Sequence, residues 1–193
     1  MSYVVGGIRC LAQVSEREIQ ELGDVLVDCV EGGASVSFML PFSRDRAASF
    51  WRNVADAVHR GERALLVSED ERGISGTVQL NFALPENQPH RADVAKMLVH
   101  RRARRRGVGA ALMRAAEMVA MERGRSLLVL DTVTDSDAAR LYERLGWVRV
   151  GEIPGYALLP GGGQVGTTVY YRELGAGADA PTASALSLSS GRK

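Results

Sequence analysis

The stretch Arg101 to Met113, "RRARRRGVGAALM", places five arginines in six positions, followed by Gly107, Gly109 and an apolar run. Residues 92–99 before it, "ADVAKMLV", have a strand pattern, and residues 107–124 carry apolar side chains at helical spacing. The next run, "SLLVLDT" at 126–132, predicts a buried strand. The three elements form a β-α-β unit, whose right-handed crossover makes the two strands parallel. The sequence therefore predicts an α/β fold.

Apolar periodicity and turn signals predict the elements around this unit. A Ser-x-x-Glu capping box starts the first helix, and 64–84 contains a β-hairpin. The expected elements are strands at 8–14, 64–70, 74–84, 147–153 and 167–174, and helices from Ser15 to Gly32, at 43–59 and at 135–145. The total is about seven strands and four helices in a mixed sheet, forming one domain over residues 1–174. Residues 175–193 are small, polar and aperiodic, which predicts a disordered tail.

Composition excludes several classes of protein. The chain has 193 residues, 46% hydrophobic and 24% charged, which is typical of one ordinary globular domain. Cys10 and Cys29 lack the spacing of a metal site or a disulfide framework, which favours a reduced, cytoplasmic protein. His59, His90 and His100 are isolated in the sequence, so no metal is expected. Neither a signal peptide nor an apolar run of about 18 residues is found, so no membrane contact is expected.

The positive charge of the chain is concentrated in one segment. Residues 91–125 hold ten basic and three acidic residues, a net +7, whereas the whole chain carries +1. Proteins that coat DNA usually spread basic residues over a whole face and have a pI above about 9. The pI of 7.8 therefore argues against nucleic acid as a partner.

The glycines explain the arginine-rich stretch better than the arginines do. A glycine-bearing turn at the start of a helix brings unpaired backbone N–H groups and a partial positive charge to one point, which suits a pyrophosphate. The P-loop and dinucleotide motifs are excluded, because neither Gly-Lys-Ser/Thr nor a third glycine is present. A merely solvated charge run would need neither the glycines nor the helix. Arg101 and Arg102 are expected to form only a basic rim.

The pattern Arg104-x-x-Gly107-x-Gly109 resembles the signature of the GNAT N-acetyltransferase superfamily. A second match lies downstream, at Ala138, Leu141-Tyr142 and Leu145-Gly146-Trp147. The resemblance covers about Ile8 to Leu174 and implies a mostly antiparallel seven-stranded sheet whose parallel fourth and fifth strands splay apart. Within the superfamily, "GGASVSFM", "RADVAKMLV", "LDT" and "GEIPGYAL" are similar to the tabtoxin-resistance acetyltransferase group, which acetylates a small amino-acid-like toxin.

The resemblance implies acetyl-CoA as cosubstrate and direct acetyl transfer to an amine in a ternary complex. The pyrophosphate is expected to bind the loop after the fourth strand. The pantetheine is expected to pair with the exposed backbone of that strand, and one further cofactor contact is expected from the start of the last helix. The implied cofactor contacts are Arg104, Arg105, Arg106, Gly107, Val108, Gly109 and Ala110, then Met97, Leu98 and Val99, and finally Ser136.

Three residues are candidates for acid and base catalysis, because the incoming ammonium must lose a proton and the leaving thiolate must gain one. Asp93 matches the position at which several members of the family carry a glutamate that acts as general base. The aspartate side chain is one methylene shorter, so a bridging water would be needed. The alternative role of Asp93 is an ion pair with Arg91 or Lys96. Asp131 follows a buried strand, where α/β sheets tend to place ligands, and otherwise caps a turn or binds a substrate ammonium. Tyr142 matches the family's thiolate-facing tyrosine, and otherwise is a core aromatic.

The acceptor pocket is expected between the "GGASVSFM" loop and "GEIPGYAL". The candidate walls are Gly33, Ser35, Phe38, Trp51 and Tyr156, for which ordinary packing is the alternative. The first functional hypothesis is acetylation of a small-molecule amine. The second hypothesis is acetylation of a protein or peptide, which would need an open acceptor groove. The third hypothesis is a binding module, either a catalytically silent acetyl-CoA-binding module or a nucleic-acid binder. A homodimer stays open, since any edge strand can pair across a dimer.

Overall fold

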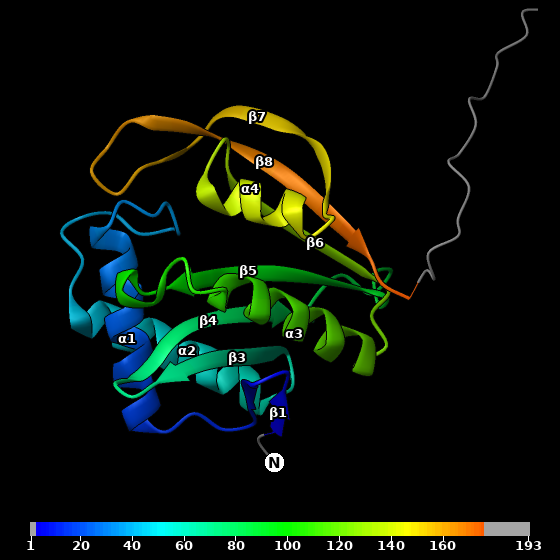
Figure 1. Cartoon of the computed structure of the whole chain (residues 1–193), viewed down its shortest axis with the longest axis horizontal. Helices are drawn as coiled ribbons and strands as arrows, with labels where there is room; N and C mark the ends of the chain where they lie inside the picture. Colours follow the sequence, from blue (N-terminus) through cyan, green and yellow to red (C-terminus); the bar gives the residue numbers. More distant parts are fainter. Residues whose placement is uncertain (1–2, 176–193) are drawn as a thin grey trace, which may run out of the picture.

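Eight strands and four α-helices make up the chain in the computed structural model, which describes residues 3–175 (Figure 1). The expected single mixed α/β domain with four helices is confirmed. In chain order the elements are β1 Tyr3–Val5, β2 Ile8–Leu11, α1 Glu16–Glu31, α2 Arg44–His59, β3 Arg63–Asp70, β4 Gly73–Asn81, β5 Arg91–Val99, a 3-10 turn at Arg101–Ala103, α3 Val108–Glu122, β6 Leu127–Val133, α4 Asp137–Arg144, β7 Val148–Leu158 and β8 Gln164–Glu173.

The strands form one sheet in the order β1-β2-β3-β4-β5-β6-β8-β7. Every neighbouring pair is antiparallel except β5 and β6, which are parallel, as the β-α-β unit predicts. The parallel pairing covers only Arg91–Asp93 against Leu127–Val129, after which the strands diverge (Figure 1). The sheet therefore opens along one line, between β1–β5 and the group β6, β8 and β7.

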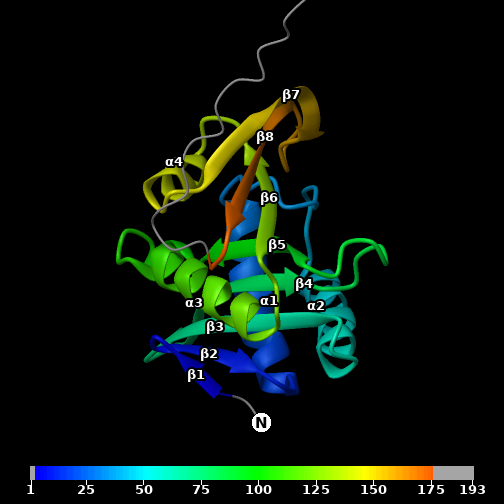
Figure 2. The same cartoon turned by 90° about the vertical axis from the view of Figure 1, so that its right-hand side faces the viewer.

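The helices cover both faces of the sheet and create two hydrophobic cores (Figure 2). Alternate residues of a strand face opposite sides, so Leu66 and Val78 pack with α3, whereas Leu65 and Val67 pack with α1 and α2. The helix starts follow the sequence signals. Ser15 and Glu18 form the complete capping box at α1, and Ser43 and Ser136 cap α2 and α4.

Two details of the strand prediction are wrong. The sheet has eight strands instead of seven, because Tyr3–Val5 pairs with β2 across a two-residue Gly6-Gly7 turn. Both glycines have positive φ, which this hairpin turn requires, so the Gly-Gly pair was the missed signal. The β7 strand also continues to Leu158, because an irregularity between Ile153 and Ala157 lets pairing with β8 resume. The segment "GEIPGYAL" is therefore part of a strand.

The cysteines, the helix lengths and the C-terminal tail were also the subject of predictions. Cys10 and Cys29 are both buried free thiols. No helix within residues 3–175 is both long and apolar enough to cross a membrane. The predicted tail at 175–193 lies, apart from its first residue, outside the described residues.

Candidate active site

A cavity of about 1270 Å³ opens where β5 and β6 stop pairing. Its wall comes from both strands, the loop between α1 and α2, the start of α3, α4, and the end of β7 with the start of β8. Ligand sites usually measure roughly 300 to 1,000 Å³. The cavity is therefore large enough for a long cofactor together with a second, small molecule.

The predicted phosphate loop forms part of this wall. Gly107 is the N-cap of α3, with φ of 82°, and a Cβ added there would meet no atom within 4 Å. Arg105 also has a left-handed backbone, with φ of 59°. The first N–H groups of α3 lack partners within the helix and carry partial positive charge, which fits an anion. Of the seven predicted loop residues, only Arg106 is outside the cavity wall.

The arginines before the loop have partners within the protein. Arg101 donates from its backbone N and from Nε to Asp28 on α1, each at 2.8 Å. Arg102 donates to Asp70 and to the Ile74 carbonyl. Neither arginine is part of the cavity wall, and the expected basic rim stays a prediction. Arg104 does line it, and its Nε donates to the Val99 carbonyl at 3.0 Å.

The predicted pantetheine strand also reaches the cavity. Met97, Leu98 and Val99 all line it, and Ser136 lies opposite at the start of α4. Because β6 pairs with β5 only as far as Asp93, the backbone of β5 beyond that point is not bonded to β6. A ligand with amide groups is able to pair with a strand edge of this kind.

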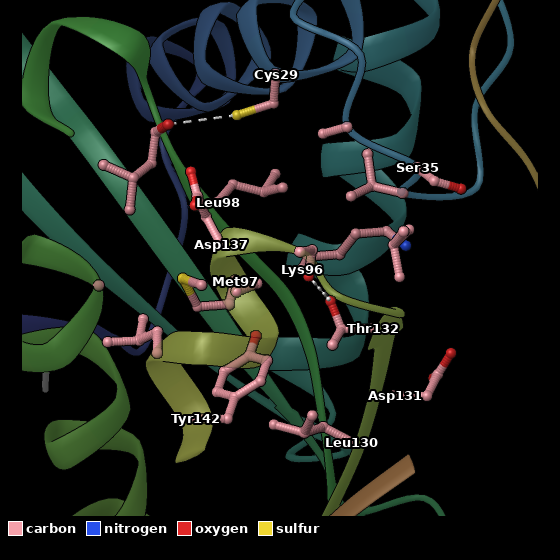
Figure 3. A pocket seen from close by; sticks show the side chains of 18 of the residues that line it. Cys29, Ser35, Lys96, Met97, Leu98, Leu130, Asp131, Thr132, Asp137 and Tyr142 are labelled. Carbon is pink, nitrogen blue, oxygen red and sulfur yellow. Dashed lines mark hydrogen bonds between the residues drawn. The ribbon is translucent and has the colours of Figure 1, made fainter. Parts of the chain in front are cut away.

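Tyr142 projects from α4 toward this strand (Figure 3). Its ring packs against Trp147 and Tyr170, at centroid distances of 5.9 and 6.1 Å, which fixes its position. Burial raises the pKa of Tyr142, and the negative charge of Asp131 adds to the effect. The phenol therefore stays protonated at neutral pH and is able to donate a proton.

The two candidate carboxylates differ in position. Asp131 lines the cavity and accepts a hydrogen bond from the Thr167 hydroxyl at 2.8 Å. Asp93 lies where the strand pairing ends, outside the cavity wall, in a 3.1 Å ion pair with Arg91. Burial raises the pKa of Asp93 despite the opposing charge of Arg91, and Asp131 raises it further. The structure therefore gives Asp131 the more direct access to a bound ligand.

The far side of the cavity is formed by the α1–α2 loop and the β7–β8 hairpin. Gly33, Ser35, Phe38 and Tyr156 line it, as expected for acceptor walls, but Trp51 does not. Trp51 is fully buried in the core between α1, α2 and the sheet, because its position on α2 faces inward. Its assignment to the pocket is therefore wrong.

Lys96 is a charged residue of the cavity wall that the sequence interpretation did not assign to the site. It lines the cavity beside the α1–α2 loop, and its ammonium donates to the Ser37 hydroxyl at 3.1 Å. The available signal was a lysine in the middle of the strand "ADVAKMLV". Among residues 3–175, no group of three or more His, Cys, Asp or Glu is arranged to hold a metal ion.

Comparison with known proteins agrees with this geometry. Residues 34–147 match the family model described as acetyltransferase (GNAT) family. Among solved structures, a putative acetyltransferase from Salmonella typhimurium with its cofactor acetyl-CoA is 17% identical, with a TM-score of 0.71, and the alignment covers 92% of this chain and 99% of that one.

Two further structures have different described activities. A ribosomal-protein-alanine N-acetyltransferase from Brucella melitensis is 20% identical, with a TM-score of 0.71 over 86% of this chain and 99% of that chain. A putative phosphinothricin N-acetyltransferase is 19% identical, with a TM-score of 0.70 over 86% and 98%. At these identities the structures share the fold alone, while the family model covers more than half of the sequence. The chain belongs to the acetyltransferase (GNAT) family.

Proposed function

We propose that this protein transfers the acetyl group of acetyl-CoA to the amine of a small molecule, by direct attack in a ternary complex. The single observation that carries the small-molecule assignment is a bridge across the acceptor side of the cavity. The Ser35 hydroxyl donates to the Leu158 carbonyl at 3.0 Å, and the Leu40 N–H donates to the Pro160 carbonyl at 2.9 Å. These bonds join the α1–α2 loop to the β7–β8 hairpin.

The residues present fit acetyl-CoA, which would supply an activated acetyl thioester. The α3 N-terminus with Gly107 would hold the pyrophosphate through backbone N–H groups, assisted by Arg104 and Arg105. The edge of β5 at Met97–Val99, which has no strand pairing with β6, would pair with the pantetheine amides. Tyr142, at the other end of this strand segment, would then face the sulfur.

The chemical roles follow from position and protonation state. Asp131 would take the proton that the acceptor ammonium loses, directly or through one water. The freed amine forms the new C–N bond at the acetyl carbon while the C–S bond breaks, and Tyr142 would donate its proton to the departing sulfur. Asp93 lies outside the cavity wall, so it would not contact the acceptor directly.

The bridge across the acceptor side favours a small molecule over a peptide. A peptide needs an open groove across the acceptor side, and the bridge between Ser35 and Leu158 crosses that side. The similarity to the tabtoxin-resistance group also supports a small, amino-acid-like acceptor. Peptide acetylation is the second candidate, because the fold is shared with ribosomal-protein acetyltransferases.

A thiol-release assay tests the proposal. Purified protein with acetyl-CoA is presented with amino acids, polyamines, aminoglycosides and peptides, and free thiol is measured. We expect release with a small amine and a loss of at least about 100-fold in kcat for Asp131→Asn, the usual size of a general-base effect. Turnover of peptides alone would contradict the small-molecule assignment. Acetyl-CoA binding by calorimetry without turnover of any amine would indicate a silent binding module.

A further inference from the structure

Lys96 is held at an irregularity of β5. Thr77 of β4 pairs with Leu98, but Gln79 pairs with Ala95, so Lys96 and Met97 together lie opposite one residue. Lys96 has φ of 49°, and its hydrogen-bond partner Ser37 has φ of 76°, both in the left-handed region that non-glycine residues rarely adopt. Strained backbone of this kind is concentrated at functional sites.

The bulge sends neighbouring side chains to opposite sides. Met97 approaches Gly109 at the phosphate loop, whereas Lys96 lies over the rings of Phe38 and Phe50, with its ammonium 5.9 and 5.8 Å from their centroids. Figure 3 shows the ends of Ser35, Lys96 and Asp131 on one side of the cavity and Tyr142 on the other. Lys96 therefore belongs to the acceptor side.

No carboxylate neutralises this lysine among the described residues. Within residues 3–175, Lys96 forms no ion pair, and its one polar side-chain partner is the neutral Ser37 hydroxyl. Burial lowers its pKa and so does the charge of Arg63, while Asp131 acts in the opposite direction. An ammonium that is partly removed from water without a counter-ion costs free energy, which a bound anion would recover.

We propose that Lys96 binds an anionic group of the acceptor, so that the acceptor is an amine which also carries a carboxylate or another oxyanion. This inference rests on the proposed function and narrows its substrate class. Asp131 would receive the ammonium end and Lys96 the anionic end. An α-amino acid, or a small analogue with a phosphinate or phosphonate in place of the carboxylate, has this distribution of charge.

The test compares two forms of the same amine. Steady-state kcat/KM is measured for a panel of α-amino acids and for their carboxamides, which keep the amine and lose the anion. For the natural protein we expect the acids to be preferred. In Lys96→Met and in Lys96→Asn the acid-to-amide ratio should fall at least about tenfold, the size expected from losing a hydrogen bond between charged groups. Asparagine tolerates the left-handed backbone, so it controls for strain at this position.

Arg52→Met is the matched control, because it removes an exposed positive charge from α2 outside the cavity wall. It should leave the acid-to-amide ratio unchanged, whereas Lys96→Arg should retain much of the preference. A purely structural role for Lys96 would lower both rates together and leave the ratio constant, which would overturn this inference alone. Equal use of acids and amides by the natural protein would do the same. If neither the acids nor the amides are acetylated while a polyamine or an aminoglycoside is, this inference alone fails. If no small amine of any kind is acetylated, the proposed function fails as well.

Discussion

Gly107 and Gly124 have the same kind of backbone at the two ends of α3, with φ of 82° and 70°, and a Cβ added at either would meet open space. Alanine should therefore cost each site about 1 kcal/mol through backbone strain alone. Only at Gly107 would the new methyl enter the space proposed for the pyrophosphate. We expect Gly107→Ala to weaken acetyl-CoA binding at least about tenfold by calorimetry, and Gly124→Ala to leave it unchanged. Equal affinities in the two variants would remove Gly107 from the cofactor site.

Tyr142 and Tyr170 form a second matched pair within one aromatic cluster. Tyr142 lines the cavity, whereas the Tyr170 hydroxyl donates to Glu143 at 2.9 Å and Tyr170 is outside the cavity wall. Removing a proton donor from the transition state should lower kcat by about 100-fold in Tyr142→Phe, with acetyl-CoA affinity kept. Tyr170→Phe should keep kcat within about threefold. A Tyr142→Phe variant with full kcat would show that solvent protonates the sulfur.

The residues that the sequence interpretation missed or misplaced share a physical cause. Gly107 and Asp131 could be predicted, because local patterns fix a helix start and a strand end. Lys96 and Trp51 could not, since their surroundings depend on contacts distant in the chain. A bulge opposite β4 turns Lys96 toward the cavity, and the packing of α2 on α1 turns Trp51 into the core.

Among the helices and strands, too, features set by local sequence patterns could be predicted, and features set by distant contacts could not. Helix caps and the β-α-β unit are local, and the sequence predicted the four helices and the one parallel strand pair. The short first strand was missed because three residues give too little periodicity, although the Gly6-Gly7 turn was visible. How far β7 extends depends on its partner β8, which no local pattern records.

The contact between α1 and the 3-10 turn before the phosphate loop predicts a pH-dependent stability. Burial disfavours the ionised form of Asp28, but hydrogen bonds from the Arg101 backbone and side chain outweigh it and lower its pKa. A lowered folded-state pKa adds stability above the unfolded value of about 4, and this stability is lost as pH falls through the folded value. We expect Asp28→Asn to lower the free energy of unfolding at pH 7 by about 1–3 kcal/mol.

Asp24→Asn is the control for this variant, because Asp24 is also on α1 and pairs with Arg44 at the surface. An exposed ion pair contributes roughly 0 to 1 kcal/mol, so this change should be small. Urea titrations at pH 7 and pH 3 measure both variants. The difference between natural protein and Asp28→Asn should shrink at pH 3, and a difference that grows there would contradict the assignment.

At the scale of the whole molecule, the sheet is continuous at one end of β5 and β6 and open at the other. Within residues 3–175, the short pairing of Arg91–Asp93 with Leu127–Val129 joins the two parts of the sheet. A cofactor bound along β5 and below α4 would contact both parts. Binding would therefore join them beyond the point where the strand pairing ends, in addition to placing the acetyl group.

This arrangement predicts where acetyl-CoA should change protection from hydrogen exchange. A ligand at about 100 times its Kd stabilises the bound form by about 2.7 kcal/mol. We expect slower exchange at Met97–Val99, at the α3 N-terminus and in α4, with little change in the β1–β2 hairpin, which lies at the far edge of the sheet. Gly107→Ala at the same acetyl-CoA concentration is the control and should show a smaller effect. Protection confined to α3, with β5 and α4 unchanged, would mean that acetyl-CoA does not occupy the opening between the strands.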